Sequence, residues 1–222
     1  MDCVTTMKIT DKKHLMKLVS FIVMGDGSVY RNRGAGNCLF SINATEDHED
    51  FLDYCAGIIS NITTTKKLYE PREAPRRNQV KLYTPVHPYF NVLRDRIYVD
   101  NYKSIDPHAL ELLDYEALAI LYMSDGCLGK YTHANGTTSY TLTINLCRLS
   151  YGDQLLLKKA LKEKLDLEFN VVKTGRKYFT LRLRTKDLAK FVEGVKPYVL
   201  DSFAYKLDIR TNSPDNSGGD IV

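Results

Sequence analysis

Residues 18–27 read LVSFIVMGDG, and residues 118–126 read LAILYMSDG. Each is an apolar run that ends in a small residue, an aspartate and a glycine, and the aspartates, Asp26 and Asp125, lie 99 positions apart. A segment repeated at such a separation indicates an internal duplication. The chain is therefore predicted to contain two similar halves, each of which supplies one carboxylate at the same place.

The apolar residues before each aspartate recur at helical spacing. We expect Asp11 and Asp114 to cap the N-termini of the two helices, and Gly27 and Gly126 to end them in a left-handed conformation. Each motif aspartate then lies at a helix C-terminus, where the negative end of the helix dipole disfavours a carboxylate by about 0.3–1 kcal/mol. A single Asp-Gly pair is more often an ordinary turn, but the matched context of the two pairs favours a shared site with a compensating cation.

Small residues, Gly25 and Ser124, precede the two aspartates and let two helix backbones approach closely. If the helices pack side by side, Asp26 and Asp125 emerge together. Two carboxylates, with backbone oxygens of Gly25 and Ser124 and with water, form an oxygen-only site that suits Mg²⁺, with Mn²⁺ as a substitute. Such a site can activate water for phosphodiester cleavage. The alternative is a plain apolar core hairpin.

Composition limits the classes of protein to consider. The chain has 222 residues, 44% of them hydrophobic, and a net charge of +4, so it can bury a core and is only mildly basic. Five cysteines without a CxxC pair favour a reducing compartment, either an organelle matrix or a prokaryotic or phage-infected cytoplasm, and argue against disulfides or zinc. We expect no membrane-spanning segment and no membrane partner.

Strand patterns follow each predicted motif helix. Residues 28–45 and 128–152 contain no acidic residue and alternate apolar with polar side chains, which predicts hairpins. Residues 78–84 and 178–184 predict further strands. Each half is therefore expected to be an α+β unit with a one-sided antiparallel sheet, in the order helix, hairpin, helix, hairpin, helix. The predicted domains are residues 1–105 and 106–210, followed by a flexible tail at 211–222.

The polar faces of these strands carry residue types that contact base edges and phosphates, although a solvated sheet face has a similar composition. A Pro-containing basic loop at residues 66–77 adds candidates for backbone contacts. The predicted DNA-binding residues are Arg31, Arg33, Ser41, Asn43, Lys66, Lys67, Arg72, Arg76, Arg77, Gln79, Lys81, Tyr83, Lys130, Thr141, Thr143, Asn145, Lys173, Arg176, Lys177, Tyr178, Thr180, Arg182 and Arg184.

The two motifs resemble those of LAGLIDADG homing endonucleases of the single-chain, two-repeat type. Residues 97–110 and 195–207 further resemble the segments that close each repeat in the branch of the yeast mitochondrial large-rRNA intron enzyme. These segments place Lys103 and Lys206 103 positions apart, close to the spacing of the aspartates. The resemblance implies that both lysines lie near the scissile phosphates and assist catalysis by Asp26 and Asp125 through their charge.

The resemblance implies a monomeric, site-specific endonuclease that cuts double-stranded DNA and leaves 3′ overhangs at a long asymmetric target. It also implies that the gene lies within an intron. Two alternatives stay open, because related proteins include RNA maturases that assist intron splicing, and because a non-cleaving DNA-binding protein can use the same scaffold.

Overall fold

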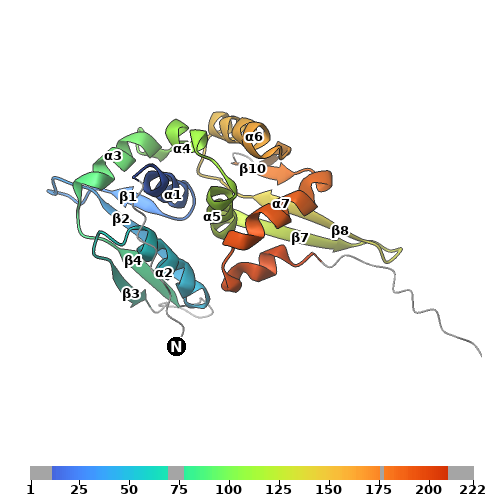
Figure 1. The fold of residues 1–222 in the computed structure, drawn as a ribbon, viewed down its shortest axis with the longest axis horizontal. Coiled ribbons are helices and arrows are strands. Elements are labelled where there is room, and N and C mark those ends of the chain that lie inside the picture. Colours follow the sequence, from blue (N-terminus) through green and yellow to red (C-terminus); the bar gives the residue numbers. More distant parts are fainter. Residues whose placement is uncertain (1–11, 70–77, 176–177, 210–222) are drawn as a thin grey trace, which may run out of the picture.

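The computed structural model describes residues 12–69, 78–175 and 178–209. Two four-stranded antiparallel sheets lie on either side of a central pair of helices (Figure 1). The predicted fold class, two pseudo-symmetric α+β units joined through their motif helices, is confirmed.

The first half begins with the motif helix and ends with a short hairpin. Its elements are α1 (Lys12–Met24), β1 (Ser28–Tyr30), β2 (Leu39–Thr45), the 3₁₀ helix η1 (Glu46–His48), α2 (Glu49–Ile58), β3 (Thr65–Tyr69), β4 (Gln79–Tyr83), α3 (Pro88–Ile97), β5 (Tyr98–Val99) and β6 (Tyr102–Lys103).

The second half repeats this order after a short connecting helix. Its elements are α4 (Pro107–Glu111), α5 (Tyr115–Asp125), β7 (Gly126–Thr132), β8 (Thr138–Ile144), α6 (Tyr151–Leu165), β9 (Phe169–Thr174), β10 (Tyr178–Leu183), η2 (Thr185–Asp187), α7 (Leu188–Val195), η3 (Lys196–Tyr198) and η4 (Asp201–Leu207).

The two large sheets share one topology. Their strand orders are β1-β2-β4-β3 and β7-β8-β10-β9, so the motif helix is followed in each half by an edge strand and its hairpin partner. Apolar side chains of one face, such as Ile42 and Leu82 in the first sheet and Leu142 and Leu181 in the second, are buried in the core. We call the opposite face of each sheet its open face.

The motif helices form the centre of the core. Residues 17–24 of α1 and 117–123 of α5 are buried on every side of their helices, as expected for helices that are enclosed by protein. At the far end of the pair, the buried Lys17 forms ion pairs with Asp114 (2.5 Å) and Glu116 (3.3 Å) at the start of α5. The ammonium group therefore links the two halves where the helices leave the core.

Several local predictions can be compared with the structure. Asp114 caps α5 as expected, because its side chain accepts a hydrogen bond from the Ala117 backbone N–H, whereas Asp11 lies outside the described residues. The left-handed ending predicted for Gly27 and Gly126 is wrong, since neither has a positive φ. A Cβ at Gly126 would overlap the ring and carbonyl oxygen of Tyr122, so close packing explains this glycine.

The predicted strand and loop limits also change. β8 ends at Ile144, well before residue 152, because Ser150 starts α6 with a capping box to Asp153. Residues 66–69, the described part of the predicted loop, belong to strand β3 and pair with β4.

The described cysteines are all free. Cys38 and Cys55 are buried, while Cys127 and Cys147 are exposed. In the part of the chain that the structure describes, no helix has both the length and the apolar character needed to cross a membrane.

Candidate active site

The C-terminal ends of the motif helices meet at two small residues. A Cβ added at Gly25 would lie 2.8 Å from both Cβ and Oγ of Ser124, so only glycine fits at this close approach. Asp26 lies in the turn that follows α1, and Asp125 is the last residue of α5. The packing that the small residues allow thus brings the two aspartates to the same end of the helix pair.

Two pockets meet at this end. One is lined by Asp26 and Asp125 together with Asn145 and Arg148 of the second half, among others. The other contains Asp26 and Ser124, together with Lys206 from the C-terminal 3₁₀ helix and polar residues of the first half, including Asn43 and Gln79. Asp26 is therefore reachable from the side of each sheet, and Asp125 from the side of the second.

The carboxylates of Asp26 and Asp125 form no ion pair or hydrogen bond with any other described residue. Partial burial raises the pKa of both carboxyl groups, although Asp26 remains exposed to solvent. The negative charge of Asp26 adds to the shift at Asp125, whose pKa rises to about 7. The charges of Lys103, Lys206 and Arg148 oppose these shifts. Two unpaired carboxylates that disfavour each other's charge are a favourable arrangement for binding a cation.

The two predicted lysines occupy matching positions. Lys103 Nζ donates hydrogen bonds to the carbonyl oxygens of Gly25 (2.5 Å) and Gly27 (2.7 Å). Lys206 Nζ donates to the carbonyl oxygens of Met123 (2.7 Å) and Tyr122 (3.4 Å). Each ammonium therefore caps the C-terminal carbonyls of one motif helix and offsets the negative end of its dipole.

This capping refines the prediction that a cation compensates the helix ends, since the chain itself supplies one at each. Burial lowers the pKa of both lysines, and Arg148 contributes to the shift of Lys103, whose pKa falls to about 8. The charges of Asp26 and Asp125 act in the opposite direction on both. The lysines thus lie within electrostatic range of the carboxylates without neutralising them by direct contact.

The oxygen atoms at this site fit a hard divalent cation better than a thiolate- or imidazole-bound metal. Across the described ranges, no group of three or more His, Cys, Asp or Glu residues is arranged to hold a metal ion. The available donors are the carboxylates of Asp26 and Asp125, the Gly25 carbonyl oxygen, which already accepts from Lys103, and the buried Ser124 Oγ, which has no partner in the structure. Such a set leaves coordination positions for water and phosphate oxygens, as Mg²⁺ and Ca²⁺ accept.

Sequence reasoning missed two side chains at this site. Arg148 lines the pocket with both aspartates, and His48 lines the pocket with Asp26 and Lys206. Both follow the second strand of their half, in the connection to the next helix. The prediction considered the expected hairpins and the loop at residues 66–77, and a search of the connections after β2 and β8 could have found both side chains.

Many predicted contact residues lie on or beside the open faces. Side chains directly opposite each other in paired strands share a face, which places Lys67 and Asn43 beside Lys81, and Thr143 beside Arg182. By the same register, Gln79, Tyr83, Thr141 and Tyr178 lie on these faces. Asn145 directly follows β8, and the exposed Arg31 and Arg33 lie in the connection between β1 and β2.

The comparison with protein families decides what kind of protein this is. The family model described as the LAGLIDADG DNA endonuclease family matches residues 20–191, which include both motif aspartates. The chain belongs to this LAGLIDADG family. The match agrees with the duplicated topology, the paired motif helices and the two aspartates at their ends.

The proteins similar to this chain include one named a maturase and others named homing endonucleases. The chain is 23% identical over 206 residues to a cytochrome b mRNA maturase, bI2, of Debaryomyces hansenii, which covers 88% of this chain and 74% of that protein. The fold of this chain is similar to that of the homing endonuclease I-WcaI bound to its DNA recognition sequence. The TM-score is 0.76 at 18% identity, over 90% of this chain and 88% of the other. The fold is also similar to that of I-DmoI in complex with DNA and Mn, with a TM-score of 0.51 at 13% identity, over 90% and 100% of the two chains.

In this LAGLIDADG protein, three predicted contact lysines lie on the wrong face. Lys66 is opposite the buried Leu82 in β4 and forms ion pairs with Glu49 (2.6 Å) and Asp53 (2.8 Å) of α2. By register, Lys130 shares the face of Leu128 and Leu142, and Lys173 is opposite Phe179. The prediction failed because charge alone does not reveal strand parity, and a shift of one residue reverses the face.

Two further predicted residues are buried. Ser41, 3% exposed, shares a hydrogen bond with Ser28 Oγ. Thr180, 2% exposed, donates its hydroxyl to the Ile144 carbonyl oxygen or to Asn145 Oδ1. Both hydroxyls therefore satisfy internal partners and are unavailable on the open faces.

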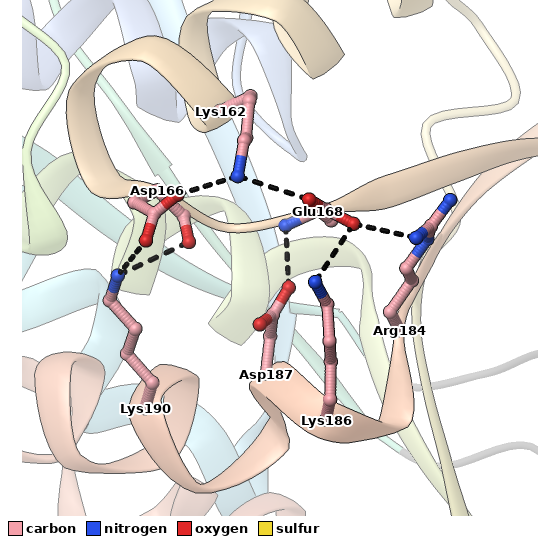
Figure 2. Close-up of polar contacts among 7 residues, drawn as sticks. All are labelled: Lys162, Asp166, Glu168, Arg184, Lys186, Asp187 and Lys190. Atoms are coloured by element: carbon pink, nitrogen blue, oxygen red, sulfur yellow. Dashed lines mark hydrogen bonds and ion pairs between the residues drawn. The ribbon is translucent and has the colours of Figure 1, made fainter.

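Arg184 belongs to a charged network (Figure 2) beside β9, the edge strand of the second sheet. Its guanidinium pairs with Glu168 (2.7 Å), which also pairs with Lys162 (3.0 Å) and Lys186 (3.2 Å). The network joins the end of α6 to β9, β10 and the start of α7 (Figure 2). Arg184, a predicted DNA-binding residue, thus has a local ion-pair partner within the protein.

The remaining predicted contact residues, Arg72, Arg76, Arg77, Arg176 and Lys177, lie outside the described residues. The open faces also carry polar side chains that the sequence analysis omitted. Tyr30 accepts a long hydrogen bond from Lys81 Nζ (3.5 Å), and the exposed Asn170 is directly opposite Arg182. The alternation that predicted their partners could have identified both.

Proposed function

We propose that this LAGLIDADG protein is a homing endonuclease that hydrolyses both strands of a long, asymmetric DNA target as a monomer and leaves 3′ overhangs. The observation that carries the proposal is the pair of unpartnered carboxylates, Asp26 and Asp125, at the packed ends of the motif helices between two polar sheet faces. A protein that only bound DNA would gain nothing from two such anions beside a phosphate backbone.

Asp26 and Asp125 would hold a divalent cation, Mg²⁺ or Mn²⁺, with help from the Gly25 carbonyl and Ser124 oxygens. When bound, the metal activates water and stabilises the leaving oxygen. Lys103 and Lys206 contribute positive charge at fixed positions, because their hydrogen bonds to the helix carbonyls hold each ammonium near the carboxylates. This charge stabilises the negative charge that develops on the phosphate. Support for a divalent metal comes from the I-DmoI complex with DNA and Mn.

Recognition of DNA is assigned to the two open faces. A two-stranded or larger antiparallel ribbon fits the major groove, where donor and acceptor patterns identify each base pair. The first open face carries Lys67, Lys81 and Tyr83 and the second carries Tyr178 and Arg182, so the two half-sites should differ in sequence. The similar fold of I-WcaI in complex with its recognition sequence supports this assignment.

A maturase that assists RNA splicing is the second candidate, because the D. hansenii relative is a cytochrome b mRNA maturase. Such a protein can keep the fold without needing metal-dependent DNA cleavage. A non-cleaving DNA-binding protein on the same scaffold is the third candidate. Retention of both aspartates favours the nuclease over these alternatives.

The test uses the purified chain and a supercoiled plasmid library with randomised inserts. Incubation with Mg²⁺ or Mn²⁺ should linearise a subset of plasmids, and sequencing of the ends should give one asymmetric target with 3′ overhangs. The matched control is the double variant Asp26→Asn, Asp125→Asn, which should bind the recovered target and leave it intact.

Failure of the wild-type chain to cut any plasmid in either metal would refute the nuclease. Cleavage by the double variant at the wild-type rate would instead refute the assignment of the site. For the maturase, splicing of a transcript of the host intron is measured with and without the chain, and stimulation without DNA cleavage would replace our proposal with the second candidate.

A further inference from the structure

Each lysine of the site lies on a segment that closes one half of the chain and contacts the other half. Lys103 is followed by Ser104, whose Oγ donates to Asp153 Oδ1 in the first turn of α6 (2.8 Å). The backbone N–H of Ile105 donates to the same oxygen (3.0 Å). The segment that carries Lys103 is thus attached at one end to α1 of the first half and at the other to α6 of the second.

The second lysine segment shows the reciprocal arrangement. Ser202, in the same 3₁₀ helix as Lys206, donates its Oγ to Asp50 Oδ1 in the first turn of α2 (2.7 Å). Phe203 stacks on His48 just before that helix, with ring centroids 4.2 Å apart. This segment therefore joins α5 of the second half to α2 of the first.

We propose that Ser104–Asp153 and Ser202–Asp50 are a matched pair of clamps that position Lys103 and Lys206 and make each lysine depend on the seating of the opposite half. This inference rests on the proposed nuclease function. The two clamps use the same chemistry, a serine hydroxyl on a lysine segment and an aspartate in the first turn of the helix after the first hairpin. A fold that needed only a hydrophobic interface would not require this polar contact at both equivalent places.

Asp153, the acceptor on the second half, is oriented by hydrogen bonds within its own half. Asp153 Oδ2 accepts from the Ser150 backbone N–H and hydroxyl, which leaves Oδ1 directed to the lysine segment. Burial acts to raise the pKa of Asp153, but the hydrogen bonds from Ser150, Ile105 and Ser104 outweigh it and lower the pKa. The Asp153 carboxylate is therefore stabilised in its charged form, in which it accepts from both the Lys103 segment and Ser150.

The clamps predict a strand-specific defect. If each lysine serves mainly one DNA strand, Ser104→Ala should slow the cut assisted by Lys103, and Ser202→Ala the other cut, each by about fivefold, the factor expected for one lost hydrogen bond. The substrate is the supercoiled plasmid that carries the target recovered from the randomised library, with Mg²⁺ as the metal. Nicked circles should accumulate with both variants, and primer extension should map the nicks to opposite strands.

The control variants separate positioning from general stability. Ser104→Thr and Ser202→Thr keep the hydroxyl and should restore concerted cleavage, while Ser60→Ala, at an exposed serine outside the site, should behave as wild type. Equal slowing of both strands by each alanine variant would indicate a merely structural contact and overturn the inference. Wild-type rates on both strands would also overturn it. A wild-type chain that cuts neither strand would instead refute the proposed function on which the clamps depend.

Discussion

Substitution of Gly25 by alanine tests whether the close approach of the motif helices holds the fold and the site together. The added Cβ would lie 2.8 Å from Ser124 Cβ, which is roughly 1 Å less than an ordinary carbon–carbon contact. Rotation of the serine hydroxyl cannot relieve this overlap, because Cβ is fixed to the backbone of α5. Gly25 has no positive φ, so the penalty is steric and involves no backbone strain.

We expect Gly25→Ala to lower the free energy of unfolding by about 1–3 kcal/mol, the usual range for overpacking a core. If the helix ends separate by roughly the 1 Å needed to relieve the overlap, DNA cleavage should also fall by about 100-fold, because reacting groups tolerate little misplacement. Urea unfolding followed by circular dichroism measures the first effect, and cleavage of the recovered target plasmid in Mg²⁺ measures the second.

The matched control is Ser124→Gly, which removes the atoms that the new methyl group meets. Alone it should cost about 0.5–1 kcal/mol as a glycine within a helix. In the double variant, the alanine should fit, and the two changes should show a coupling of about 1–2 kcal/mol in a double-mutant cycle. Additive effects, or a single Gly25→Ala variant within about 0.5 kcal/mol of wild type, would refute the close-packing argument.

Three further predictions concern charged side chains. Lys67→Ala should reduce the slope of log binding constant against log salt concentration by about one unit, since Lys67 lies on the open face, whereas Lys66→Ala should leave that slope unchanged. DNA-binding titrations at several salt concentrations in EDTA compare the two variants, and equal slopes for both would contradict the face assignment. Lys17→Met should lower the free energy of unfolding by about 1–3 kcal/mol in urea, because it leaves the half-exposed Asp114 without its buried partner; an unchanged midpoint would contradict this. The folded pKa of Asp153 lies below its ordinary value of 3.8, so its contribution to the free energy of unfolding is complete above that pH and is lost as the pH falls through the folded pKa. The free energies of unfolding of wild type and Asp153→Asn, plotted against pH, should therefore converge in acid. Parallel plots would exclude the linkage.

The sequence was sufficient for the architecture because the determining signals were local and repeated. The runs that end in Asp26 and Asp125 identified two motif helices, and apolar alternation in the following segments identified the hairpins. Duplication then supplied the relation between the halves, because equivalent elements occur in the same order. The predicted domain boundary at residue 105 stays a prediction.

The open faces were only partly predictable. Lys66 and Lys67 are adjacent and chemically identical, yet one pairs with α2 and the other lies beside Lys81. Their faces depend on the register of β3 against β4, which hydrogen bonds between distant residues determine. Ser41 and Thr180 show the same limit, because burial and internal hydrogen bonds decide whether a polar side chain can reach DNA.

The sequence by itself determined that this protein has two motif helices, each ending in a small residue and an aspartate. Only the tertiary structure decided that Lys103 and Lys206 cap those helix ends and that serine–aspartate contacts join each lysine segment to the opposite half. The physical reason is distance along the chain. A helical repeat is encoded by neighbouring residues, whereas a carbonyl that receives a lysine 78 or 83 positions away is specified only when the packed halves bring them together.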